Sequence, residues 1–153
     1  MTGDLLNSPA DIVAHLLEDS AYVNFPEDGG DWQAFIGQMP DEPDTAIGFY
    51  DTAGDNEGRS HVTGETFAKY GVQLRARSLS PLAGWLKMKD IKVHFDTINR
   101  LTVYIGEATY LVQAVHRRGE IVRNGKEPES NRFIHTLNVI VTVRLTSTTG
   151  TGT

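Results

Sequence analysis

The chain has 153 residues, enough for one domain with a sizeable core. Its formal net charge is -6 and its longest basic run is the pair Arg117-Arg118, which argues against nucleic acid as the main partner because phosphate binding needs a positive face. The chain contains no cysteine, so disulfides, thiolate metal sites and cysteine nucleophiles are excluded. The acidic start and the lack of any stretch of about 20 apolar residues predict a soluble protein without membrane contact.

The first predicted element is a helix from about Ser8 to Asp19. Ser8 can cap its first turn, Pro9 has no N–H to leave unpaired there, and Asp11 lies near the positive end of the helix. The apolar residues recur at helical spacing: Ile12, Val13, Leu16 and Leu17. One face of this helix is therefore expected in the core.

Three strands are predicted next, over residues 32–38, 45–50 and 67–77. Turn-forming residues separate the first two, and the polar, glycine-rich residues 51–64 should form an exposed excursion before the third. The third strand alternates between an apolar and a polar face, with Ala68, Tyr70, Val72, Leu74 and Ala76 opposed by Lys69, Gln73, Arg75 and Arg77. That period indicates a half-buried strand.

A second, longer helix is predicted from Ser80-Pro81 to about Ile98. Its apolar residues recur at steps of three and four: Leu82, Trp85, Met88, Ile91 and Phe95. Strands follow over residues 101–105, 109–116 and 132–145, and the charged residues 117–131, which contain the turn pair Asn124-Gly125, should project as a long loop.

This order of elements predicts an α+β fold, a single twisted mixed or antiparallel β-sheet with two main helices packed on it. We assign residues 1–145 to this domain. Residues 146–153 contain no apolar side chain, so we expect a flexible polar tail that orders only on a partner.

A search for catalytic or metal-binding patterns gives no positive result. The five histidines are scattered and are expected to be solvated or capping, although His116 and His135 lie near facing ends of two strands that could be neighbours. The acidic residues of 41–44 and 51–57 lack the order of a calcium loop, and no nucleophile elbow or phosphate-binding glycine motif is present. We therefore expect no enzyme activity, no cofactor and no metal.

Positive charge is concentrated on the third strand and in residues 117–131. The residues concerned are Lys69, Arg75, Arg77, Arg117, Arg118, Arg123 and Lys126. In an acidic protein such clusters can contact an acidic patch on a neighbouring copy. A solvated face of ordinary arginines is the alternative interpretation.

Three stretches carry a family resemblance: PDEPDTAIGFYDTAG, KYGVQLRARS followed by PLAGWLKM, and RRGEIVRNGKEPESNRFIHTLNVIVTVR. Together they resemble phage minor capsid proteins grouped with the tail terminators of long-tailed phages, over about residues 9–145. The resemblance implies a structural virion protein that forms a hexameric ring at the head-proximal end of the tail tube. Its partners would be the tail tube protein and the head-tail connector or stopper, with assembly in the host cytoplasm.

The resemblance implies that such a ring stops tube elongation and provides the surface for head attachment. Candidate contact residues are Asp51, Asp55 and Glu57 in the excursion, Arg117, Arg118, Arg123 and Lys126 in the loop, and Arg75 and Arg77 on the strand. The alternatives are a head-completion protein of the neck, a small adaptor with one apolar patch, and an enzyme with a concave polar pocket.

Overall fold

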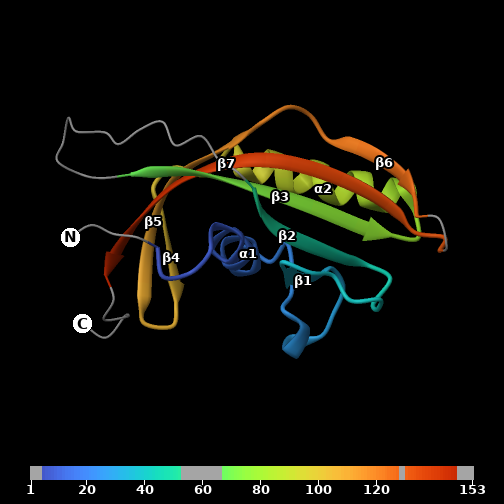
Figure 1. Cartoon of the computed structure of the whole chain (residues 1–153), viewed down its shortest axis with the longest axis horizontal. Helices are drawn as coiled ribbons and strands as arrows, with labels where there is room; N and C mark the ends of the chain where they lie inside the picture. The colour runs from blue at the N-terminus through green and yellow to red at the C-terminus, as the bar shows by residue number, and fades with distance from the viewer. Residues whose placement is uncertain (1–4, 53–66, 128–129, 148–153) are drawn as a thin grey trace.

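A computed structural model describes residues 5–52, 67–127 and 130–147 (Figure 1). Most of the predicted excursion, the tail from residue 148 onward, and the candidate residues Asp55 and Glu57 lie outside the described residues. The helices are α1 (Pro9–Asp19), the short 3-10 helix η1 (Pro26–Asp28) and α2 (Pro81–Phe95). The strands are β1 (Gln33–Ile36), β2 (Ala46–Thr52), β3 (Ala68–Ser78), β4 (Leu101–Ile105), β5 (Ala108–Arg117), β6 (Val122–Lys126) and β7 (Phe133–Ser147).

The seven strands form one mixed sheet in the order β1-β2-β3-β7-β5-β4, with β6 beside β7. Only β1 and β2 pair in parallel among these strands. The long strand β7 pairs with β3 along one edge and with β5 and then β6 along the other. Irregular register within the β5–β7 pair accompanies a bend that turns the β4–β5 hairpin away from the β3–β7 pair (Figure 1).

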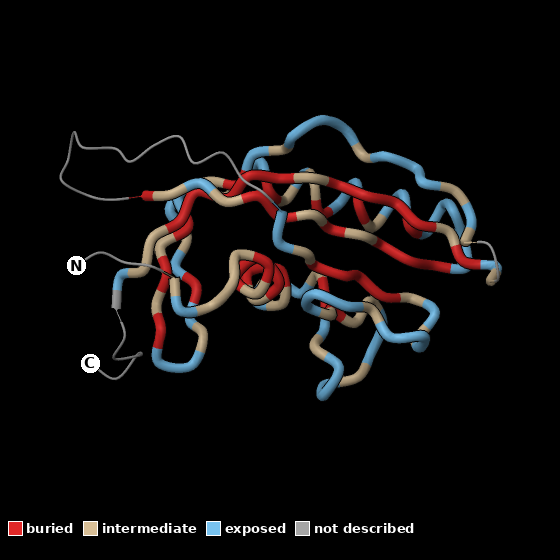
Figure 2. Tube along the Cα trace, viewed as in Figure 1, coloured by how far each residue is buried: buried red, intermediate tan, exposed pale blue. Residues whose placement is uncertain are grey.

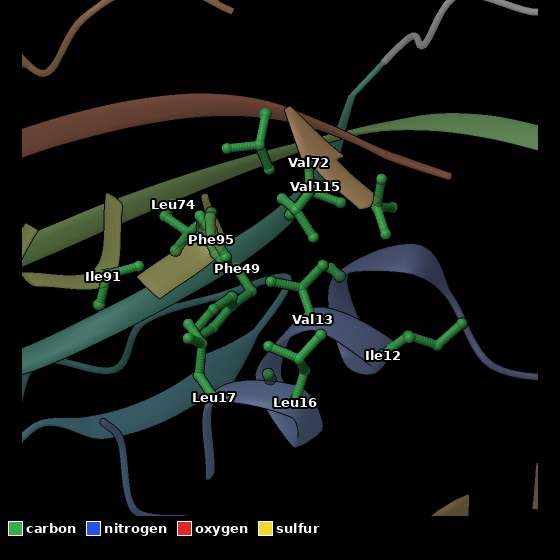
Figure 3. Close-up of a cluster of buried hydrophobic side chains, with 14 of the residues drawn as sticks. Ile12, Val13, Leu16, Leu17, Phe49, Val72, Leu74, Ile91, Phe95 and Val115 are labelled. Carbon is green, nitrogen blue, oxygen red and sulfur yellow. The ribbon is translucent and has the colours of Figure 1, made fainter. Parts of the chain in front are cut away.

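Both helices pack on the same face of this curled sheet, so the predicted α+β fold is confirmed. Phe49, Leu74 and Leu137 are in register on three adjacent strands, and all three are fully buried. Figure 3 shows side chains of α1 meeting Phe49 and Val72, and Figure 2 shows that burial follows the middle strands and the facing side of α1.

The start of α1 is fixed by two acceptors. The Ser8 hydroxyl accepts a hydrogen bond from the Asp11 amide at 3.2 Å, as the sequence predicts. Asp51, at the end of β2, adds a carboxylate that accepts from the Ala10 amide at 2.8 Å. A side chain from the sheet therefore completes the cap of a helix 41 residues earlier in the chain.

The prediction of one long loop over residues 117–131 is wrong, because β6 lies within it. Val122 and Lys126 pair with β7, and the register shifts before Gly125, which has a φ of 92°. The side chains of β6 are mostly exposed, so the strand has no buried face and shows no apolar alternation. In addition, α2 ends at Phe95, three residues before the predicted end.

Connections gather at two opposite ends of the sheet (Figure 1). One end holds the close of β2 at Thr52, the start of β3 and the β4–β5 turn. The other holds residues 37–45 between β1 and β2, the β3–α2 connection, Glu127 and residues 130–132. At about 3.3 Å per residue, the eleven residues of β3 alone separate these ends by roughly 35 Å.

Candidate interface surfaces

Arg77 is buried, with 4% of its surface exposed, so its predicted place on an exposed basic face is wrong. Its Nη2 donates a hydrogen bond of 2.5 Å to the carbonyl of Pro43, because the connection between β1 and β2 folds over this end of β3. Burial lowers the pKa of Arg77, and the nearby positive charge of Arg132 lowers it further. Arg77 therefore holds a loop within the subunit.

Arg132, which the sequence analysis did not single out, fixes the same connection. Its guanidinium donates to the Asp44 carboxylate at 2.9 Å and to the Asp41 carbonyl at 2.5 Å, and its side chain is 10% exposed. The acidic turn predicted at residues 41–44 thus has a specific buried partner. The acidic run at residues 41–44 has no basic residue beside it, and this was the available signal for a distant cationic partner. The sequence does not show which arginine that partner is.

Arg117 lies at the end of β5 and joins this strand to the end of α2. Its guanidinium is 3.6 Å from both Asp96 and Glu120. Lys92 donates to Glu120 at 2.9 Å, and this hydrogen bond lowers the pKa of Glu120. Asp96, Arg117 and Glu120 also line an open polar hollow of about 370 Å³ together with His116 and Gly119. The carboxylates in this hollow are already ion-paired.

The other predicted basic residues divide by exposure. Arg75 is half-buried on β3, whereas Arg118, Arg123 and Lys126 are exposed on or just before β6. Among the described strands, β6 pairs only with β7, so its outer edge faces away from the sheet. Charged side chains on such an edge disfavour non-specific strand pairing. The edge can still bind a partner of complementary charge.

The acidic candidate Asp51 is exposed, but its carboxylate is engaged by the amide of Ala10. It lies at the end of the sheet from which the excursion departs. Asp51 therefore has a structural role in addition to any contact that it makes with a partner.

The expectation of solvated or capping histidines fails at His135. This residue is fully buried, and neither ring nitrogen has a hydrogen-bond partner among the described groups. Burial lowers its pKa, and Arg123 contributes in the same direction. His116 is exposed opposite Ile140, so the two histidines are not paired across the strands. Within the described ranges, no three His, Asp or Glu side chains are placed to hold a metal ion.

Part of the predicted core face of α2 is exposed. Met88, Ile91 and Phe95 are buried as predicted, but Leu82 is 63% and Trp85 36% exposed. Leu86 and Val93 are exposed as well. The described surface of α2 therefore includes an apolar face that periodicity alone had assigned partly to the core.

The family model described as "Bacteriophage tail terminator protein" matches residues 19–144. The chain belongs to the bacteriophage tail terminator family. Among curated proteins, none matches this sequence. As a member of this family it is a structural protein of the virion tail, and no helix in its described part is long and apolar enough to cross a membrane.

Proposed function

We propose that this tail terminator closes into a hexameric ring on the head-proximal end of the tail tube, stops tube elongation and offers its free side to the head connector or stopper. The family match over residues 19–144 supports this assignment. The work is done by shape and contact, without a reaction centre or cofactor. Assembly takes place in the host cytoplasm.

The observation that carries the proposal is the gathering of connections at two opposite ends of one sheet. A terminator needs two different surfaces, since the face that binds the tube must differ from the face that meets the head side. Asp51 and the departure of the excursion lie at one end, while Lys126 and the connection fixed by Arg132 lie at the other. Six copies with the same orientation would present two chemically distinct rims.

Growth of tail tubes in vitro tests this function. The cognate tube protein is polymerised with and without the terminator, and tube lengths are measured by electron microscopy. We expect the terminator to halt growth, with one ring on one end of each tube. Tubes that grow to the same lengths in both samples would refute the proposal.

A binding experiment separates the proposed role from the neck alternative. Purified terminator is mixed either with preformed tubes or with heads that carry their connector. A terminator binds tube ends in the absence of heads. Binding to connector-bearing heads alone would instead support a head-completion protein.

A further inference from the structure

The helix α2 is apolar on two opposite faces. Gly84, Met88, Ile91 and Phe95 face the sheet and are buried. Leu82, Leu86 and Val93, which we call the outer stripe, are spaced by four and seven residues and share the other face. They are 63%, 44% and 53% exposed. A helix that is apolar on both sides is typical of one packed between two layers, and the described chain supplies one of them.

The flanks of α2 show which way the outer stripe points. The Lys87 ammonium donates to the Tyr22 carbonyl at 2.9 Å and lies 5.6 Å from the centre of the Trp32 ring. Lys92 is paired with Glu120 on the other flank. Both flanks are therefore held by the subunit itself, so the outer stripe between them faces outward.

The position of α2 favours a lateral neighbour in the ring. The helix lies alongside β3 and β7, between the two ends of the sheet (Figure 1). The proposed function assigns those ends to the tube and to the head side, which leaves the sides for copies of the same chain. A closed ring of identical subunits joins two different surfaces of adjacent copies. The outer stripe needs a complementary surface elsewhere on the chain.

A complementary surface lies along β1, the outermost strand beside β2. Ile36, at the end of β1, is 40% exposed. The segments before and after β1 carry exposed acidic residues: Glu27, Asp28, Asp41 and Glu42. Lys89 is exposed within the outer stripe, three residues after Leu86 and four before Val93. An exposed isoleucine with acidic residues around it thus matches an apolar stripe that contains a lysine.

We infer that, given the proposed ring, the outer stripe of α2 docks against the β1 edge of the next copy. Trp85, beside the stripe, adds a large aromatic surface of the kind that anchors interfaces. A helix of 15 residues is about 22 Å long and supplies the centre of the contact. A standard interface buries about 800 Å² per partner, so the segments flanking β1 must contribute to the contact as well.

Charge introduced into the outer stripe tests this contact. Leu86→Glu and Lys89→Glu should each weaken ring formation at least tenfold, measured as subunit stoichiometry on tube ends by mass photometry. Val122→Glu is the matched control, because Val122 at the start of β6 is 50% exposed and lies outside both surfaces and outside the two ends of the sheet. Circular dichroism melts show that the variants fold. Rings that persist in both α2 variants, or equal loss in the control, would overturn the assignment.

The lack of cysteine allows the partner surface to be mapped directly. Leu86→Cys labelled with a photo-crosslinker should join adjacent copies, with the second attachment in residues 26–44. Attachment to α2 itself, or no crosslinked dimer on tubes that carry rings, would contradict the inference while leaving tube capping intact. Wild-type protein that stays monomeric at high concentration and also at tube ends would overturn both this contact and the proposed ring.

Discussion

At the scale of single residues, Gly84 allows α2 to approach the sheet. A Cβ at this position would lie 2.7 Å from Nδ1 of His135 and 2.9 Å from Oγ of Ser78. Alanine favours a helix by about 1 kcal/mol over glycine, but overpacking a buried site costs about 1–3 kcal/mol. We expect Gly84→Ala to lower the free energy of unfolding, measured by urea denaturation. Combined with His135→Ala, which removes one of the two obstructing groups, the same change should cost less stability than it does alone; additive effects would contradict this contact.

His135 predicts a dependence of stability on pH. Its pKa is lowered in the folded state, mainly by burial, with Arg123 on β6 adding repulsion; Ser78 and Gly84 face it from β3 and α2 without charge. The unfolded chain therefore binds more protons at acidic pH, and the contribution of His135 is present above about pH 6.5 and is lost as pH falls through its folded pKa. His135→Leu should flatten the decline of stability between pH 7 and 5. His15 and His94 remain in both proteins, so parallel profiles would refute this role.

Two arginines that were both predicted as candidate contact residues should differ in their effect on stability. Arg77→Ala removes a buried side chain that donates to the carbonyl of Pro43, and it should lower the free energy of unfolding by about 1–3 kcal/mol. Arg118→Ala removes an exposed side chain and should change it by no more than about 0.5 kcal/mol. Urea denaturation of both variants makes the comparison. Equal losses would show that the burial of Arg77 does not matter for folding.

At the scale of elements, Asp51 links β2 to the start of α1. Asp51→Ala removes the acceptor for the Ala10 amide and should cost about 0.5–2 kcal/mol in thermal or urea unfolding. Asp51→Asn keeps a side-chain oxygen and should retain most of that stability. An asparagine variant as unstable as the alanine variant would argue against a capping hydrogen bond.

The elements that could be predicted from the sequence are those with a buried face. Alternation in β3 and β7 and the caps at Ser8 and Ser80 fixed those elements to within a few residues, because burial imposes a period and a helix start needs an acceptor. β6 was missed because its side chains are mostly exposed and therefore show no apolar alternation. Its pairing with β7 depends on backbone hydrogen bonds, which leave no pattern in the sequence.

The surfaces were less predictable than the fold. Charge clusters predicted that residues 117–131, which include β6, are basic and exposed. Whether a given arginine faces solvent, however, depends on loops from distant parts of the chain, as Arg77 and Arg132 show. Helical spacing at Leu82 and Trp85 indicated an apolar face but did not show whether this chain or another one covers it.

At the scale of the whole molecule, the ends and the sides of the sheet offer different surfaces. We propose that the two ends of the sheet contact the tube and the head side, and that its sides form the contacts between copies. The ends are separated by the length of β3 and β7, and the sides are formed by α2 and the β1 edge. On this proposal, the subunit would block further tube growth because its outward end differs from the end that binds the tube.

The most direct measurement is the position and number of terminator subunits on isolated tails, determined by cryo-electron microscopy of tails released before head attachment. We predict one ring of six copies at the head-proximal end and nowhere else on the tail. Subunits distributed along the tube, at its distal tip, or present only on heads would contradict it.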